Sequence, residues 1–210
     1  MVGEPVVPEQ IGLISAFGER ENEQEVVKKI PTAVMTKHFN AVYEALIFRE
    51  FEKARDHAEK YYKLKIESHC KDWPQYNRTL YFGLVSFWIG REHNDRKWIA
   101  RGNESKNSME KLASVASTWN FQNKTYLLQA EEQFSERNFD LAEKLYDDAI
   151  LSSRKHRFLN EEALANELAG NFYLDTGRKG KSSHYFSQAE KKYREWGATA
   201  KADAISQMTY

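Results

Sequence analysis

The tripeptide Gly180-Lys181-Ser182 has the composition of a phosphate-binding loop. In nucleotide-binding proteins this ending places backbone N–H groups and a lysine against the phosphates. The same loop needs a glycine five residues before Gly180, where this chain has Asp175, and it needs a preceding strand, where this chain has a helical pattern. We therefore interpret the tripeptide as the start of a helix, and we expect no nucleotide or other cofactor.

Histidine and cysteine are the residues best suited to transition metals, but their spacing here does not favour a metal site. None of the 6 histidines has a second histidine or cysteine four residues away on one helix face. The single cysteine, Cys70, directly follows His69, and adjacent helix residues point apart. No serine occupies the Gly-x-Ser-x-Gly pattern of hydrolases. We predict no metal ligands, no catalytic residues and no enzymatic activity, and the lone cysteine favours a reducing, cytoplasmic compartment.

Two further groups of residues have a chemical and a structural interpretation. Glu143, Asp147 and Asp148 could form a carboxylate site, but Lys144 lies on the same helix and a solvated face is the simpler reading. The 5 tryptophans could stack on nucleic-acid bases, yet 31 Lys and Arg residues are balanced by 31 Asp and Glu residues. The longest apolar run, residues 80–89, is shorter than the ~20 residues of a membrane span. We expect neither nucleic acid nor a membrane as a partner.

Three polar residues share or border a helix face that otherwise consists of leucine, alanine, glycine and aromatic residues: Asn166, Glu167 and Asn171. They could line a groove that holds a partner peptide. They could instead make hydrogen bonds between repeats, because an unpaired buried polar group costs ~1–3 kcal/mol, and we favour this structural role. With three equivalents from the repeat alignment, the candidate partner-binding residues are Asn77, Lys124, Glu131, Asn166, Glu167 and Asn171.

The helices that carry these candidates show an internal repeat of about forty residues. Its aligned pairs are Ala130 with Gly170, Ala142 with Ser182, Tyr146 with Phe186, and Ala149 with Ala189. Small residues recur where two helices approach closely, and aromatic residues recur where a larger side chain fills the gap. This pattern is typical of an α-solenoid, in which each helical hairpin buries its apolar face against the next.

The remaining sequence extends this pattern into an all-α chain. Only 4 prolines and 10 glycines are present, and no alternating pattern of useful length predicts a strand. The predicted repeat domain, residues 36–210, follows a poorly structured or truncated lead-in over residues 1–35. Its hairpins are expected near residues 36–68, 76–117, 121–156 and 160–195, with a terminal helix over 198–208. Residues 102–107 are weak helix formers and predict either a break or a long exposed helix.

Local signals predict several details of these helices. The segment 90–94 looks like a turn, and Asn160 is a good N-cap residue. Gly177 and Gly197 follow apolar periodic segments and predict left-handed helix ends. The helix that contains Gly83 is apolar nearly all round, so it should be the most buried, with Gly83 as a point of close helix contact.

Two sets of residues also carry a family resemblance. The alanines and tyrosine of the repeat, at positions 130, 142, 146 and 149, resemble a tetratricopeptide-type repeat. The C-terminal part of the sequence resembles the last part of a helical-repeat region in large multidomain kinase and histidine-kinase signalling proteins. In those proteins the repeat region lies downstream of an AAA-like or STAND-type ATPase domain. This likeness covers residues 39–205 and is most specific over A-L-A-N-E-L-A-G-N-F-Y at 163–173, Y-R-E-W-G-A at 193–198, and Lys201-Ala202.

The resemblance implies a tetratricopeptide-like repeat region without the catalytic modules of that family, either part of a longer protein or a free-standing relative. The expected function is a protein–protein interaction or regulatory scaffold in cytoplasmic signalling, with a protein or adjacent ATPase or kinase domains as partner. The alternative is a small all-α ligand-binding protein or enzyme, with a pocket among Tyr81, Trp88, Trp98 and Trp119.

Overall fold

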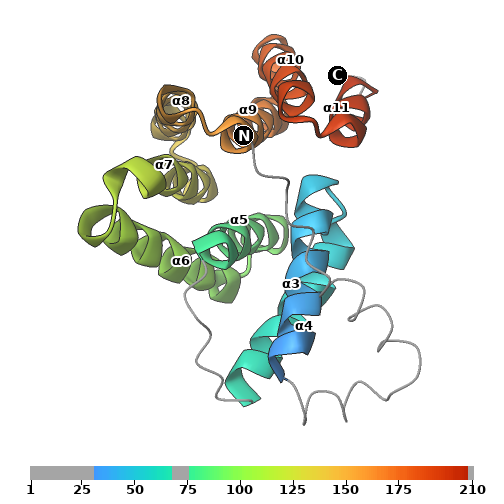
Figure 1. Ribbon diagram of the computed structural model, residues 1–210, viewed down its shortest axis with the longest axis vertical. Helices are drawn as coiled ribbons and strands as arrows, with labels where there is room; N and C mark the ends of the chain where they lie inside the picture. Colours follow the sequence, from blue (N-terminus) through green and yellow to red (C-terminus); the bar gives the residue numbers. More distant parts are fainter. Residues whose placement is uncertain (1–30, 68–75, 208–210) are drawn as a thin grey trace, which may run out of the picture.

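The computed structural model describes residues 31–67 and 76–207, and within these ranges the chain is all-helical (Figure 1). The prediction of an all-α chain is therefore confirmed for the described residues. The described residues form nine helices: α3 (Pro31–Ile47), α4 (Phe51–Glu67), α5 (Tyr76–His93), α6 (Arg96–Val115), α7 (Thr118–Ser135), α8 (Phe139–His156), α9 (Leu159–Asp175), α10 (Lys179–Trp196) and α11 (Thr199–Ser206).

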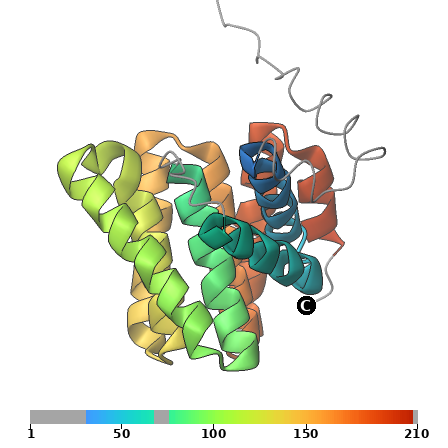
Figure 2. The same ribbon diagram turned by 90° about the horizontal axis from the view of Figure 1, so that it is seen from below.

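Consecutive helices pack as pairs, α3 with α4, α5 with α6, α7 with α8, and α9 with α10. Figure 1 shows that the pairs follow one another around an arc, with α5, α7 and α9 on its inner side. The view from below places α3 beside the last helices of the chain (Figure 2). A hydrogen bond from Lys201 Nζ on α11 to the carbonyl oxygen of Ile47 at the end of α3 joins the two ends of the arc.

The residues that recur at the forty-residue spacing lie in the contacts between helices, as predicted. Each of the following is at most 1% exposed: Ala130, Ala142, Tyr146, Ala149, Ser182, Phe186 and Ala189. A Cβ atom added to Gly170 would lie 2.9 Å from the ring of Phe186, so α9 and α10 need a glycine there to approach closely.

Helix α5 is buried over every residue from Leu80 to Gly90, which confirms its predicted place in the core. A Cβ atom on Gly83 would lie 2.6 Å from Leu128 Cδ2 on α7 and 2.8 Å from Ser105 Cβ on α6, so the close contact is confirmed as well. Of the two alternatives expected for residues 102–107, a break or a long exposed helix, the structure has the long helix, because α6 runs through them without interruption. Gly102 lies there under the ring of Phe87, and the opposite side of α6 faces solvent.

Two predicted helix ends are wrong. Helix α5 continues to His93, and Gly90 is buried against Ile99 instead of forming a turn. The N-cap of α9 is Phe158, not Asn160, because the helix already begins at Leu159. The left-handed ends at Gly177 and Gly197, with φ of 75° and 93°, are confirmed.

Three arginines, Arg49, Arg137 and Arg157, take the same left-handed conformation at other turns, and no sequence signal indicated them. The first described helix begins at Pro31, earlier than the predicted residue 36. Proline is favoured in a first helical turn because it lacks the N–H that would have no partner there.

Some predictions fall on residues outside the described ranges. They concern most of the lead-in, the His69-Cys70 pair, and the end of the terminal helix at Met208. Among the helices over residues 31–67 and 76–207, none combines the length and the apolar character that crossing a membrane requires.

Candidate functional site

The C-terminal ends of α5, α7 and α9, together with the turns that follow them, enclose a cavity of about 1030 Å³. Its walls combine apolar, basic and acidic residues. They are Gly90, Arg91, Glu92, Asn94, Ile99, Phe134, Ser135, Arg137, Phe139, Asp140, Asp175, Thr176 and Arg178. Successive helix pairs therefore contribute their turns to one concave site.

Aromatic rings form the apolar part of the cavity wall. Phe134 ends α7 and meets Phe172 of α9 edge to face, with ring centroids 5.1 Å apart. Phe139 begins α8 and lies 6.2 Å from Phe134 and 6.1 Å from Phe172. Phe139 is nevertheless 39% exposed, an unusual exposure for a large apolar side chain, and it borders the cavity.

Two of the three arginines in the wall are held by rings and carboxylates of the protein. The Arg91 guanidinium lies 4.2 Å over the ring of Phe134 and forms a 2.7 Å ion pair with Glu131. Arg178 lies 4.8 Å over the ring of Phe172 and donates a 2.8 Å hydrogen bond to Glu143. These contacts pair both guanidiniums with carboxylates of the chain, whereas Nη2 of Arg178 is buried without a hydrogen-bond partner in the described residues.

The other charged residues of the wall have no ion pair with any residue in the described ranges. They are the carboxylates of Glu92, Asp140 and Asp175 and the guanidinium of Arg137. Burial raises the pKa of the Asp175 carboxyl, although Arg49 and Arg91 act in the opposite direction. The cavity therefore presents three carboxylates and one guanidinium whose charges are not paired.

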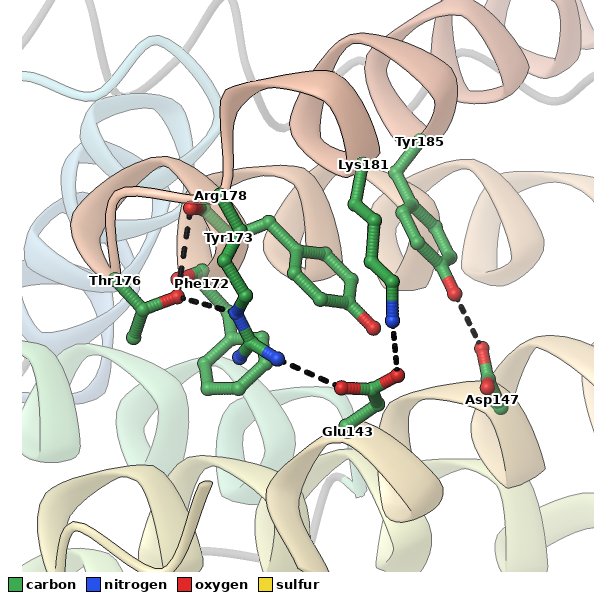
Figure 3. A network of polar contacts seen from close by, with 8 residues as sticks. All are labelled: Glu143, Asp147, Phe172, Tyr173, Thr176, Arg178, Lys181 and Tyr185. Atoms are coloured by element: carbon green, nitrogen blue, oxygen red, sulfur yellow. Dashed lines mark hydrogen bonds and ion pairs between the residues drawn. The ribbon is translucent and has the colours of Figure 1, made fainter. Parts of the chain in front are cut away.

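A polar network behind Arg178 attaches the cavity rim to α8 (Figure 3). Glu143 of α8 accepts hydrogen bonds from Arg178 at 2.8 Å and from Lys181 at 2.6 Å. The hydrogen bond from Lys181 is the main reason why the pKa of the Glu143 carboxyl lies below its ordinary value. The network fixes the turn between α9 and α10, and with it the position of Arg178.

A second link joins the same helices one turn further along α8. The Tyr185 hydroxyl donates a 2.6 Å hydrogen bond to Asp147, and its ring stacks on Tyr173 at a centroid distance of 5.0 Å (Figure 3). Burial, assisted by Asp147, raises the pKa of Tyr185 to about 12. The prediction of a simple solvated face for the 143–148 carboxylates is therefore wrong for Glu143 and Asp147, which connect α8 to α10.

Two of the predicted partner-binding residues lie on the inner helices and are buried with charged partners. Glu131 accepts from the Tyr146 hydroxyl at 2.7 Å in addition to its ion pair with Arg91. Glu167 forms a 2.6 Å ion pair with Lys201 and accepts from the Tyr193 hydroxyl at 2.8 Å. In each carboxylate, one oxygen therefore accepts from a tyrosine hydroxyl and the other is paired with a cation of the chain.

The other four predicted residues are distributed along the molecule. Lys124 is buried in a 2.8 Å ion pair with Glu161. The side chain of Asn166 donates to the carbonyl oxygen of Glu162 at 2.8 Å, and that of Asn171 donates to the carbonyl oxygen of Glu167 at 3.0 Å. Asn77 is exposed in the first turn of α5. None of the six lines the cavity, and their role in partner binding stays a prediction.

No sequence motif pointed to the charged wall of the cavity. Arg91, Glu92, Arg137, Asp140 and Arg178 all lie within a few residues of a turn between helices. Charged residues near turns usually only face solvent, so their type and spacing carry little signal. The repeat gave one indication of this site. Segment 135–139 aligns with segment 175–179 at the forty-residue spacing, and both segments contribute to the cavity wall.

The aromatic residues of the alternative pocket do not border this cavity. Tyr81, Trp88 and Trp98 pack inside the hydrophobic core. Trp119 is 58% exposed at the start of α7, where its ring lies 4.0 Å from that of His156. These four side chains therefore occupy two different environments.

Within the described ranges, no group of three or more His, Cys, Asp or Glu side chains is placed to hold a metal ion. Comparison of the chain with protein-family models, with curated proteins and with solved structures gives no match.

Proposed function

We propose that this chain is a non-catalytic α-solenoid of tetratricopeptide-like hairpins that binds another protein through the cavity at its helix turns. The observation that carries the proposal is the exposed ring of Phe139 beside three unpaired carboxylates in a cavity of about 1030 Å³. Aromatic residues are enriched at the centre of protein interfaces, where a polar rim surrounds them.

The inner side of the arc is the other surface that could hold a partner, but side chains of the chain itself fill it. This favours the cavity at the helix turns as the binding surface. Glu131 and Glu167 are buried there, and Lys201 of the last helix closes over Glu167. Burial lowers the pKa of Arg49 in the α3–α4 turn, and the nearby carboxylates of Glu167 and Glu131 oppose this effect. A partner peptide would have to displace these contacts, whereas the cavity is already open.

The resemblance of the 163–202 region to repeat segments of signalling ATPases suggests the setting of this interaction. We propose a cytoplasmic regulatory role, in which the partner is a separate protein or an ATPase or kinase domain of the same assembly. The pairwise packing of the helices and the recurrence of Ala142, Tyr146 and Ala149 at helix contacts support the repeat assignment.

The test compares the intact chain with a cavity variant and a matched control on the same helix. Phe139→Ala removes the exposed ring from the cavity, while Leu151→Ala removes an exposed side chain of α8, 57% accessible, that does not line it. A partner isolated with the wild-type chain should bind the Leu151→Ala variant equally well. Isothermal titration with the purified partner should show at least tenfold weaker binding to Phe139→Ala.

A second cavity variant keeps the test valid if Phe139→Ala disturbs the fold. Arg137→Gly removes the unpaired guanidinium at a position whose φ of 62° favours glycine, so the turn is retained. Equal partner affinity of the wild type, both cavity variants and the control would overturn the proposed function. A saturable thermal shift with a small metabolite that is lost in Phe139→Ala, without any protein partner, would favour the ligand-binding alternative.

A further inference from the structure

We propose that a second surface, at the N-terminal ends of α5, α7 and α9, binds an acidic segment of a partner protein. Five aromatic rings form this surface, the aromatic strip: Tyr76, Trp119, Phe121, His156 and Phe158. The cavity of the proposed function lies at the C-terminal ends of the same helices. Because the 18 residues of α7 span about 27 Å, the strip and the cavity are separate surfaces.

The rings of the strip follow one another from α7 through the α8–α9 turn to α5. The ring of Trp119 lies 4.0 Å from that of His156, which lies 6.3 Å from that of Phe158. Lys124 continues the path, with its Nζ atom 4.9 Å from the ring centroid of Phe158 and 5.7 Å from that of Tyr76. The strip is therefore contiguous although its residues come from three separate segments of the chain.

The two ends of the aromatic strip are open to solvent. Trp119 is 58% exposed and Tyr76 is 44% exposed, and the ring of Tyr76 meets that of Phe121 edge to face at 5.6 Å. Single exposed apolar side chains are common on protein surfaces, whereas contiguous exposed ones mark interaction sites. Tryptophan and tyrosine are also enriched among the residues that contribute most to binding. The strip therefore suits an apolar side chain of a partner.

The buried lysine of the strip supports the rings and leaves no charge for a ligand. Lys124 forms a 2.8 Å ion pair with Glu161 and donates a 2.8 Å hydrogen bond to the carbonyl oxygen of Asn120. Its side chain is 4% exposed. The charges of Lys124 and Glu161 are therefore matched within the chain, and the preference for a charged partner depends on the residues around them.

Those residues give the surface an excess of positive charge. The segments 76–78, 118–124 and 154–162 carry five cations and two carboxylates, which are Arg78, Lys124, Arg154, Lys155, Arg157, Glu161 and Glu162. The net charge of the three segments is therefore +3 with neutral histidine. Neighbouring helices leave this balance unchanged: Lys192 of α10 reaches Glu162 but also pairs with Glu195, and Lys111 of α6 is offset by Glu110.

Arg157 is the cation best placed to meet an acidic partner. It lies in the turn between His156 and Phe158, two members of the strip, and it is exposed. Lys155, on the other side of His156, is exposed as well. Neither cation has an ion pair with any residue in the described ranges. Carboxylates next to an apolar side chain would complement this combination of open cations and rings.

The same charges favour an acidic protein segment over a nucleic acid. Binding of a phosphate backbone requires a cluster of Lys and Arg residues that is not interrupted by carboxylates. Glu161 and Glu162 lie beside the strip, and the 31 basic residues of the chain are balanced by 31 acidic ones. A short run of carboxylates can contact Arg157 and Lys155 without approaching these two glutamates.

The test titrates the intact, isotope-labelled chain with blocked pentapeptides and follows backbone amide and tryptophan indole signals by NMR. The probes are acetyl-Glu-Glu-Leu-Glu-Glu-amide, its glutamine counterpart as the neutral analogue, and its lysine counterpart as the cationic one. We expect the acidic peptide to shift the indole signal of Trp119 and the amide signals around Tyr76 and Phe158. The other two peptides should bind roughly tenfold more weakly.

Two pairs of variants distinguish the strip from the cavity. Trp119→Ala and Phe139→Ala each remove an exposed ring, from the strip and from the cavity respectively. Arg157→Gly and Arg137→Gly each remove one charge at a left-handed turn, with φ of 60° and 62°, where glycine retains the backbone conformation. We expect both strip variants to bind the acidic peptide several-fold more weakly and both cavity variants to bind it like the wild type.

Several results would contradict the inference. They are equal binding of the three peptides, equal losses in the strip and cavity variants, and an unchanged affinity in both strip variants. Tighter binding of a single-stranded oligothymidylate of about eight nucleotides than of the acidic peptide would assign the strip to a nucleic acid instead. A shift of the Trp119 indole signal with the concentration of the chain alone would assign it to a second copy.

Discussion

At the scale of single residues, the described chain contains a pair of histidines whose protonation affects the stability of the fold. His38 on α3 and His57 on α4 approach with their Nδ1 atoms 2.9 Å apart. One Nδ1–H group must donate to the lone pair of the other ring. Protonation of the accepting ring replaces the lone pair with a second donor, so the bond between α3 and α4 is lost.

This pair predicts a pH dependence of stability. Burial lowers the pKa of His57 from its ordinary 6.5, with Lys60, Lys37 and Lys53 acting in the same direction and Asp56 in the opposite one. Between 6.5 and the lower pKa of the folded state, the unfolded chain binds more protons than the folded chain. The stability present above pH 6.5 is therefore lost as the pH falls through this window.

The measurement is the melting temperature of the intact chain between pH 8 and pH 5. The wild type should lose more stability on acidification than His57→Gln, in which the titrating ring is absent. The other histidines titrate in both proteins, so the difference between the two profiles isolates the pair. Parallel profiles would show that His57 is not held in its neutral form by the fold.

At the scale of helices, close packing overrides intrinsic helix propensity. Gly102 lies in the middle of α6, where alanine would ordinarily favour the helix by roughly 1 kcal/mol. A Cβ atom there would lie 2.7 Å from Cε1 and 2.8 Å from Cδ1 of Phe87, and the ring of Phe87 is fully buried. The contact between α5 and α6 therefore depends on the absence of a side chain at this position.

Two glycine substitutions test this reasoning. Gly102→Ala should destabilise the chain by about 1–3 kcal/mol, because the added methyl group overpacks the α5–α6 contact. Gly180→Ala, in the first turn of α10, has nothing within 4 Å of the added atom and should stabilise by up to about 1 kcal/mol. Urea unfolding of both variants gives the two signs, and a stabilising Gly102→Ala would mean that α5 and α6 lie further apart than in this structure.

At the scale of the whole molecule, Lys201 connects the last described helix to both the inner helices and the first pair. Its Nζ atom forms a 2.6 Å ion pair with Glu167 of α9 and donates to the carbonyl oxygen of Ile47 at the end of α3. The side chains of Lys201 and Glu167 are 4% and 2% exposed. Removal of one partner would leave the other charge buried with fewer hydrogen bonds.

The predicted cost of breaking this contact is large. Lys201→Met should lower the free energy of unfolding by about 3–5 kcal/mol, and the double variant with Glu167→Gln should recover much of that loss because no buried charge remains unpaired. The control is Arg194→Met, which breaks an exposed pair with Glu190 and Asp203 and should cost less than about 1 kcal/mol. Similar denaturation midpoints for Lys201→Met and Arg194→Met would contradict the role of Lys201 in joining the ends of the arc.

The sequence by itself determined the helices and the contacts between neighbouring ones. The recurrence of Ala142, Tyr146 and Ala149 identified helix faces, and Gly177 and Gly197 identified helix ends, because periodicity and backbone conformation are local properties. The same local rules failed at Gly90, which a turn signal placed at a helix end although packing against Ile99 keeps it inside α5.

Only the tertiary structure decided where the open surface lies. Phe139 and Asp175 come from different turns, and they line one cavity because α7 and α9, which lead into these turns, pack side by side. Glu167 is buried because α11 returns to that side of α9 and supplies Lys201. Such contacts join residues that lie far apart in the chain, so no short segment of sequence encodes them.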